Sequence, residues 1–389
     1  MKLTFSVIVF FGLAVALFHG APAYAQTAAT SIFTVVPTPN ENQFNSSLFA
    51  ASASSASDIW AVGDSTIHFD GTKWTAFPAP LINGQNTAFL QGVADISPTL
   101  AWAVGNVVDG ANAGQMIQQW NGTKWSLFPG PTFPPGSQAD LFGISSISAN
   151  DIWAVGNFVN AGFDFNLFEH WDGTTWTATT IPKNTFESLT AVSADSTNDA
   201  WAVGSSEGSI GKTLAIHWDG TSWQEVATPN AGAGTNILNA VLSLAPDNVW
   251  AVGSSTPVAP PKQAATLTLI EHFDGTSWKV VPSPNVGPKT VSQSNRLLGL
   301  TANSPNDIWA FGSFFAANGS GHQMTLLLHW DGNSWTVAPS PNPTRGTFLD
   351  DLLFAGVVPS PGNVWIVGNE DEGAQGGMGT LAIHTTTGD

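Results

Sequence analysis

The chain has 389 residues and a formal net charge of −18 at pH 7, because 28 acidic residues outnumber 10 lysines and arginines. So few cationic side chains cannot form a basic surface that neutralises phosphates, which excludes nucleic acid as a partner and disfavours anionic membrane surfaces. The sequence contains no cysteine, so no disulfide bridge stabilises it. The length suits one large repeat domain or two ordinary domains.

The first 25 residues have the pattern of a secretory signal peptide. Lys2 supplies a positive start, an apolar run extends from Leu3 to Phe18, and Ala23-Tyr24-Ala25 supplies the small residues that precede a cleavage site. The apolar run is short for a membrane-spanning anchor. We therefore expect cleavage after Ala25, a mature chain that begins at Gln26, no membrane insertion, and a secreted protein in an extracellular or periplasmic location.

A tryptophan followed three residues later by glycine, usually as Trp-Ala-Val-Gly, recurs seven times at intervals of 42 to 59 residues. A repeat of this length is typical of radially repeated β-sheets. The sequence therefore predicts an all-β fold, a seven-bladed β-propeller whose blades we number 1 to 7 in chain order. The repeat tryptophans are Trp60, Trp102, Trp153, Trp201, Trp250, Trp309 and Trp365.

Each repeat predicts four antiparallel strands. Leucine always lies twelve residues before the repeat tryptophan and a small residue always lies ten before it, as at Leu48 and Ala50. We expect this pair to share one face of the innermost strand, where neighbouring blades crowd. The repeat tryptophan lies on the second strand, and the third strand ends in His-Trp-Asp-Gly, as at His170 to Gly173. The Asp-Gly pair starts a tight turn, after which the fourth strand opens with tryptophan, as at Trp176.

The seventh repeat has no fourth strand after Ala382-Ile383-His384. The segment Ser31 to Asn40 matches Thr276 to Asn285, with Phe33 in the place of Trp278. We therefore expect residues 31–40 to complete the last blade and close the ring, which removes the exposed edges of an open solenoid. The predicted organisation is a signal peptide over residues 1–25 and a single, monomeric propeller domain over residues 26–389.

The repeat, Trp-Ala-Val-Gly, a polar loop and then His-Trp-Asp-Gly-Thr-Ser-Trp, as at His217 to Trp223, resembles the repeats of kelch-type and tectonin-type β-propellers. The similarity covers essentially the whole mature chain. This chain departs from the kelch pattern in having one glycine after the second strand and aromatic residues five apart, as at Trp171 and Trp176. Tectonin-like propellers are lectin-like or surface-recognition proteins, and kelch-like ones include protein-binding modules and a few enzymes. The resemblance implies binding rather than catalysis.

The residues that recur at fixed repeat positions are expected to be structural, because a need met in every blade is a need of the fold. We expect the tryptophans to pack blade against blade. The aspartate of each Asp-Gly pair, as at Asp172, is expected to form a turn rather than act as an acid. One third-strand position holds histidine in six blades and Gln119 in blade 2, which favours a hydrogen-bonded role over metal binding. These histidines are His68, His170, His217, His272, His329 and His384.

Function is expected where the repeats differ, in the loops between second and third strands and in the connections between blades, which share one face. This loop is shortest in blade 1, so we expect the face to be lopsided. No metal or cofactor is expected. The candidate ligand-binding residues are Asp140, Glu187, Arg296, Asp350 and Asp351 at the channel mouth, Phe314, Phe315 and His322 in blade 6, and the loop Glu370, Asp371 and Glu372 in blade 7, with Phe163 to Phe165 as a further apolar loop.

Three functions compete at this point. The leading hypothesis is a secreted, non-enzymatic module that binds a glycan or another surface polymer on the variable-loop face. The second is a carboxylate-dependent glycan hydrolase or lyase, in which a pair among Asp140, Glu187 and Asp351 acts as acid and base across the channel. The third is a structural or protein-docking scaffold of the cell envelope or matrix.

Overall fold

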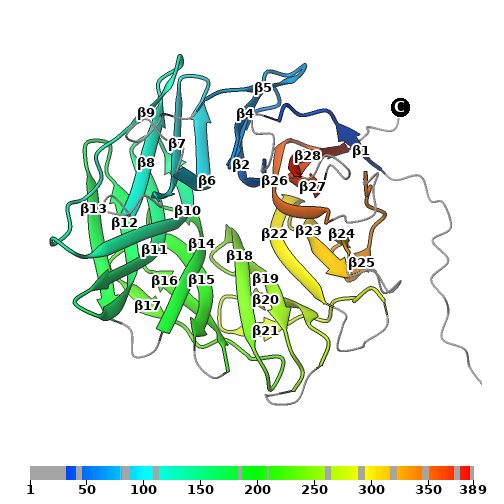
Figure 1. Cartoon of the computed structure of the whole chain (residues 1–389). Helices are drawn as coiled ribbons and strands as arrows, with labels where there is room; N and C mark the ends of the chain where they lie inside the picture. Colours follow the sequence, from blue (N-terminus) through cyan, green and yellow to red (C-terminus); the bar gives the residue numbers. More distant parts are fainter. Residues whose placement is uncertain are drawn as a thin grey trace, which may run out of the picture. The chain divides into compact units, whose positions relative to one another are not determined.

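The computed structural model describes residues 32–40, 46–78, 80, 88–107, 114–182, 186–207, 210–258, 264–287, 294–315, 322–343, 350–371 and 377–385. These belong to the compact unit Ser31–Asp389. Within the ranges just given, the unit consists of seven four-stranded antiparallel sheets and contains no helix. Figure 1 shows the sheets following one another around a central axis. The predicted seven-bladed β-propeller is confirmed.

Blades 1 to 4 each consist of four consecutive strands with the innermost strand first. Blade 1 contains β2 (Leu48–Ser55), β3 (Asp58–Gly63), β4 (Thr66–Phe69) and β5 (Trp74–Ala76). Blade 2 contains β6 (Ala88–Ser97), β7 (Leu100–Val107), β8 (Gly114–Trp120) and β9 (Trp125–Leu127). Blade 3 contains β10 (Gln138–Ser148), β11 (Asp151–Asn160), β12 (Phe163–Trp171) and β13 (Trp176–Pro182). Blade 4 contains β14 (Phe186–Ser196), β15 (Asp199–Glu207), β16 (Lys212–Trp218) and β17 (Trp223–Glu225).

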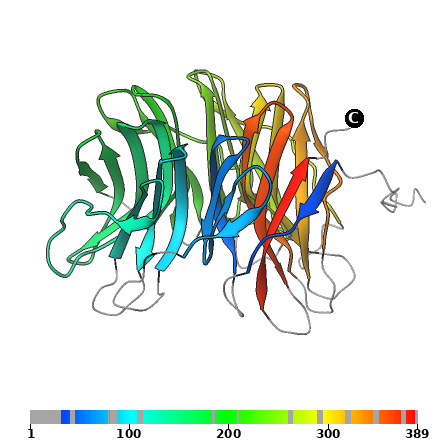
Figure 2. The same ribbon diagram turned by 90° about the horizontal axis from the view of Figure 1, so that it is seen from above.

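Blades 5 and 6 repeat this order, and blade 7 takes its outer strand from the N-terminal segment. Blade 5 contains β18 (Asn236–Ala245), β19 (Asn248–Ser255), β20 (Leu267–Phe273) and β21 (Trp278–Val280). Blade 6 contains β22 (Asn295–Ser304), β23 (Asp307–Phe315), β24 (Gln323–Trp330) and β25 (Trp335–Val337). Blade 7 contains β26 (Leu352–Ser360), β27 (Asn363–Asp371), β28 (Met378–Thr385) and β1 (Phe33–Val36). Figure 2 shows that the strands run between the two faces of this unit, where the connections gather.

The core lies between the blades and is built from the repeat tryptophans. Trp102 of blade 2 is fully buried, and its ring centroid lies 4.9 Å from that of Trp171 and 5.5 Å from that of Trp176 in blade 3. Trp153 meets Trp218 and Trp223 of blade 4 in the same way, at 5.0 and 5.1 Å. Because indole rings bury a large apolar surface, this repeated contact holds each blade against the next. The predicted packing role of the tryptophans is confirmed.

The N-terminal strand closes the ring as expected. β1 pairs antiparallel with β28, with Phe33 opposite Thr385 and Val36 opposite Ala382. Phe33 is 1% exposed, and its ring centroid lies 5.1 Å from that of Trp309 in blade 6. It therefore occupies the site that a fourth-strand tryptophan fills in the other blades.

The residues after β1 fasten this closure with hydrogen bonds that recur in other blades. Asn40 Oδ1 accepts a hydrogen bond of 2.8 Å from the Thr380 amide, and the Thr38 hydroxyl donates one of 2.8 Å to the Thr380 carbonyl. In blade 5, Asn285 Oδ1 accepts the equivalent bond from the Thr268 amide at 2.9 Å. The match between the two sequence segments thus corresponds to a match in hydrogen bonding.

The expected arrangement of the innermost strands is wrong in one respect. The pairing of every innermost strand with its second strand shifts register between the repeat leucine and the small residue, as between Leu48 and Ala50. This β-bulge inserts one residue, so the two side chains lie on opposite faces. Leu48 packs in the cluster shared with blade 7, and Ala50 packs against the cluster shared with blade 2. The small residue is still explained by crowding, because a Cβ on Gly143 would lie 3.0 Å from Ala191 Cα of blade 4.

The bulge also explains the glycine of Trp-Ala-Val-Gly. A Cβ on Gly156 would lie 1.8 Å from the backbone carbonyl oxygen of Asp140 on the neighbouring strand. The same backbone clash, at 1.8 to 2.1 Å, would occur at the equivalent glycine of every blade. Any side chain at this position must therefore push the two strands apart.

Replacing Gly156 by alanine is expected to destabilise the protein by about 3 kcal/mol or more, because backbone atoms cannot move aside as a flexible side chain does. Thermal unfolding measures this loss. The control is Gly130→Ala, whose new Cβ would meet only the ends of the Gln115 and Ile117 side chains within 3.0 Å. Equal melting temperatures for the two variants would show that the bulge tolerates a side chain.

Candidate functional site

The bulges give the central channel its lining. In each blade the inserted residue, eleven before the repeat tryptophan, is left out of the pairing with the second strand. Each of these residues lines a cavity on the axis of the ring. One side chain from every blade therefore meets the others there. The seven are Phe49, Gln91, Phe142, Thr190, Asn239, Leu298 and Phe354.

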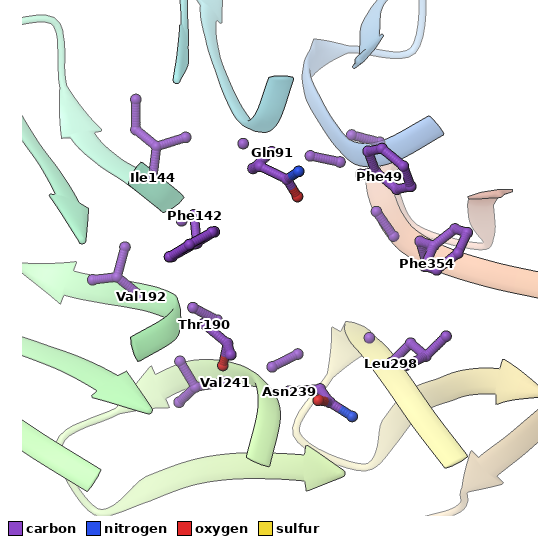
Figure 3. Close-up of a pocket in the computed structure, with 18 of the residues that line it drawn as sticks. Phe49, Gln91, Phe142, Ile144, Thr190, Val192, Asn239, Val241, Leu298 and Phe354 are labelled. Atoms are coloured by element: carbon purple, nitrogen blue, oxygen red, sulfur yellow. The ribbon is translucent and has the colours of Figure 1, made fainter. Parts of the chain in front are cut away.

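The cavity has a volume of about 220 Å³ and is lined by all seven innermost strands. Figure 3 shows the bulge residues arranged around the opening. The remaining lining residues are small or aliphatic, such as Gly92, Val192 and Ala240, and none of the described residues that line the cavity is charged. The site is a concave pocket between rigid strands.

The lining combines apolar and polar side chains. Leu298, Phe354 and Phe49 come from the consecutive blades 6, 7 and 1, and the rings of Phe49 and Phe354 lie 5.4 Å apart, edge to face. Across the opening in Figure 3, Phe142 of blade 3 lies beside Thr190 of blade 4, and Asn239 follows from blade 5. A ligand in this cavity would therefore meet aromatic rings and hydrogen-bonding groups around the same opening.

The polar groups are held by the neighbouring blade. The Thr190 hydroxyl lies 3.0 Å from the backbone carbonyl of Leu238 and 3.1 Å from that of Val203, and it donates to this pair. Asn239 Nδ2 donates a hydrogen bond of 2.7 Å to the backbone carbonyl of Leu297. These bonds fix the rotamers and leave Asn239 Oδ1 and the Thr190 lone pairs as acceptors. The site is thus oriented before a ligand arrives.

Two of the predicted rim carboxylates lie at the starts of innermost strands, each bonded to an amide side chain. Asp140 Oδ2 accepts a hydrogen bond of 3.0 Å from Gln138 Nε2, and Glu187 Oε2 accepts one of 2.9 Å from Asn166 Nδ2. Burial raises the pKa of Asp140, while hydrogen bonds from Gln138 and Asn106 lower it to a smaller extent. Arg296 is exposed at the start of β22.

The remaining mouth residues divide between surface and interior. Asp350 Oδ1 accepts a hydrogen bond of 2.7 Å from the Gln323 amide, next to the half-buried His322. Asp351, expected on the rim, is only 1% exposed, because it enters the packed start of the innermost strand β26. It is therefore not available to a ligand on the face, and this expectation is corrected.

Several candidates expected in loops belong to strands. Phe314 and Phe315 end β23, and Phe314 packs against the cluster between blades 5 and 6. Glu370 and Asp371 end β27, opposite Gly379 and Met378 of β28. Glu372 lies outside the described residues. The second strands are longer than the sequence repeat predicts, because the third strands continue to pair with them.

The connection between second and third strands differs between blade 1 and blade 3, the two blades in which the structure describes all of it. In blade 1, β3 ends at Gly63 and β4 begins at Thr66. In blade 3, β11 and β12 extend into a hairpin whose turn residues, Ala161 and Gly162, have positive φ angles of 51° and 82°. Phe163 follows this turn and is 70% exposed. The expected apolar loop of blade 3 is thus a β-hairpin.

The recurring polar residues have the structural roles that the sequence predicts. His170 Nε2 lies 2.8 Å from Asp151 Oδ1, and its ring stacks on Trp153 at 4.2 Å. All six repeat histidines bond an aspartate or asparagine in this way. Asp172 Oδ1 accepts hydrogen bonds from the next turn, and these donors lower its pKa to about 2. Across the described ranges, no three His, Asp or Glu side chains are grouped as metal ligands are.

Sequence reasoning missed two sets of residues. The first is the seven bulge residues, whose only signal is variability between an invariant leucine and an invariant small residue. The second is a pair of buried carboxyl groups, Glu169 in blade 3 and Glu271 in blade 5, both with 0% exposure. Burial raises the pKa of each to about 8. Their signal is a glutamate immediately before the repeat histidine, where blades 1 and 4 carry isoleucine.

No helix in the described part of the chain has the length and apolar character to cross a membrane. No protein-family model matches the sequence, and no curated protein matches it.

Solved structures with the same fold are found at low sequence identity. YCF48 from Cyanidioschyzon merolae is 14% identical, with a TM-score of 0.56, over 91% of this chain and 98% of that chain. YCF48 bound to D1 peptide is 15% identical, with a TM-score of 0.55, over 92% and 97% of the two chains. The GH74 xyloglucanase from Xanthomonas campestris is 12% identical, with a TM-score of 0.55, over 87% of this chain and 53% of that one. At these identities the similarity establishes the propeller fold alone.

Proposed function

We propose that this protein is an exported recognition module that binds a glycan or another surface polymer at its central channel and the face around it. The observation that carries the proposal is the bulge repeated in all seven blades, which turns seven different side chains into one neutral cavity. Because these side chains differ from blade to blade and belong to none of the hydrophobic clusters between the blades, they can vary to suit a ligand. The signal-peptide pattern of residues 1–25 supports export.

Similar propellers support a polymeric ligand. One of the solved YCF48 structures holds a D1 peptide, and another similar structure is a xyloglucanase. A peptide and a xyloglucan are both chains of linked units. The cavity at the axis of this chain's ring suits a polymer that reaches the channel from the face.

Filling the cavity is expected to abolish binding. Gln91→Trp adds an indole to the channel at a residue whose amide faces the opening (Figure 3), and we expect at least about tenfold weaker binding to any glycan or polymer that the wild-type protein retains. The measurement is a glycan array combined with sedimentation on insoluble polysaccharides and surface proteins. Leu127→Trp on β9 is the control, because it lies in the same blade but is 50% exposed on the outer strand.

Two results would count against the proposal. The first is a wild-type protein that binds no glycan, polysaccharide or surface protein. The second is a Gln91→Trp variant that folds and binds as well as Leu127→Trp does. Circular dichroism and the melting temperature of both variants establish that a loss of binding is not a loss of folding.

A further inference from the structure

We infer that the channel cavity binds the terminal ring of an uncharged hexose glycan. This inference rests on the proposed recognition function and adds the chemical class of its ligand. The first observation is size, because a cavity of about 220 Å³ is enclosed on its sides by one bulge residue from every blade. A single sugar ring or amino-acid side chain matches this scale better than a longer polymer segment, so we expect a glycan to enter by its end.

The second observation is the absence of charge. The cavity walls are the bulge side chains and the aliphatic or small residues beside them, and among these described residues none is ionisable. A carboxylate or ammonium group placed there would lose its hydration and gain no counter-ion, which is costly. Uronic acids, sialic acids and the free termini of a peptide are therefore unsuitable ligands, whereas a neutral sugar is suitable.

The third observation is the mixture of aromatic and hydrogen-bonding side chains in the lining. A pyranose ring has an apolar C–H face and an edge of hydroxyl groups. Phe49 and Phe354 offer apolar surface to the C–H face, and Phe142 offers a further ring across the opening. Thr190 and Asn239 offer hydrogen-bonding groups to the hydroxyl edge. In Figure 3, Gln91 lies on the rim of the same opening between Phe49 and Phe142.

The hydrogen-bonding capacity of these groups also matches hydroxyls. The Thr190 hydroxyl gives its only hydrogen to backbone carbonyls, and Asn239 Nδ2 gives one of its two hydrogens to the Leu297 carbonyl, so Thr190 presents an acceptor and Asn239 both an acceptor and a donor. The Gln91 carboxamide has both a donor and an acceptor. Sugar hydroxyls donate and accept at neighbouring atoms and can satisfy both kinds of group at once. A hydrocarbon side chain would leave these polar groups unpaired, which is unfavourable.

The test is a titration of the wild-type protein with methyl glycosides of glucose, galactose and mannose, followed by saturation-transfer NMR and calorimetry. We expect at least one to bind with a Kd on the order of 1 mM, as a ligand of about a dozen heavy atoms allows. Glucuronic acid and N-acetyl-asparagine methylamide, as the charged and peptide probes, are expected to bind at least about tenfold more weakly.

Variants of one residue separate this inference from the broader function. Gln91→Leu keeps the volume of the side chain and removes its amide, so the glycoside affinity is expected to fall about tenfold or more, while Gln91→Asn retains part of it. Suppose that the wild-type protein binds a polymer, and that the Gln91→Leu variant binds this polymer and the glycosides with wild-type affinity. The inference is then wrong, and the proposed function stands. Tighter binding of the peptide probe than of every glycoside also overturns the inference. If no polymer or probe binds, both proposals fail.

Discussion

Replacing Glu169 and Glu271 together by glutamine is expected to raise the melting temperature by about 10 °C or more at pH 8.5 and to change it little at pH 4. Both carboxyl groups are fully buried between blades, and burial raises the pKa of each to about 8 from an ordinary value of 4.5. The nearby Gln115 amide lowers the pKa of Glu169, and the nearby Thr213 hydroxyl lowers that of Glu271, but each offsets only part of the rise.

The direction follows from proton binding. Below pH 4.5 each carboxyl is protonated in both the folded and the unfolded chain and contributes no pH dependence. Between pH 4.5 and about 8 the unfolded chain loses the proton while the folded protein keeps it, so the free energy of unfolding falls as the pH rises. A shift from 4.5 to about 8 corresponds to a loss on the order of 5 kcal/mol for each group above pH 8. Glutamine keeps the shape and cannot ionise.

Melting curves of the wild type and the double variant from pH 4 to pH 9 measure this difference. Glu225→Gln on β17 is the matched control, because Glu225 is exposed and its replacement should leave the curves unchanged. Some pH dependence should remain in the double variant, since burial and the nearby Asp58 carboxylate raise the pKa of Asp95 to about 7. Parallel curves for the wild type and the double variant would mean that the two glutamates are not buried as charged groups above pH 8.

Deletion of residues 26–40 is expected to unfold the protein or to make it aggregate at 37 °C. The deletion removes β1, the buried Phe33 and the hydrogen bonds of Thr38 and Asn40 to Thr380. Burial of the phenylalanine contributes about 1.5–3 kcal/mol, and each hydrogen bond about 0.5–1.5 kcal/mol. Their combined loss, about 5 kcal/mol or more, is comparable to a typical total stability of about 5–15 kcal/mol. β28 would also become an exposed edge strand.

Thermal unfolding and light scattering of the truncated and full-length proteins check this result. Phe33→Trp is the control, because tryptophan fills the equivalent site in the other six blades and should be accepted. Phe33→Ala should lie between the two, with a loss of about 3–5 kcal/mol. A truncated protein that stays monomeric and melts with the full-length chain would show that the N-terminal strand contributes nothing to the ring.

The sequence was sufficient to predict the number of blades and their closure because both depend on residues that recur at fixed positions. Phe33 could be aligned with the fourth-strand tryptophans, and the structure places it against Trp309 as those tryptophans lie against their own neighbours. The hydrogen-bonded histidines were predictable for the same reason, since Gln119 replaces one of them and preserves a polar group. Residues that recur in every blade indicate how the blades pack, but they say little about the ligand.

The channel lining could not be predicted from the sequence, because regular alternation along an extended strand places the leucine and the small residue on one face. One inserted residue, such as Phe142 between Leu141 and Gly143, moves each later side chain of the strand to the opposite face of the sheet. The inserted residue has no recognisable sequence pattern, since its identity varies from blade to blade. Gly156 is recognisable in the sequence as a recurring glycine. The glycine is required because the backbone carbonyl of Asp140 approaches it closely, and a backbone contact of this kind cannot be read from the sequence.

The candidate residues on the rim were misplaced for a different reason. Loops were expected wherever the repeats differ in length, but Phe163 and Glu370 continue strands β12 and β27. Ladder hydrogen bonds extend as long as both partners remain in register, and sequence variation does not interrupt them. Asp351 is buried although it is charged, because it lies where the innermost strand begins. Position in the fold therefore decided exposure more than residue type did.

The pairing of β1 with β28 also has a consequence for the timing of folding. The hydrogen bond from Thr38 to Thr380 joins residues 342 positions apart, whereas every strand pair of blades 1 to 6 joins neighbouring segments. Contacts between such distant segments form late, because the whole intervening chain must first be available. β1 therefore cannot pair until β28 has been synthesised. In a chain that is exported as proposed, the ring cannot close until β28 has also crossed the membrane.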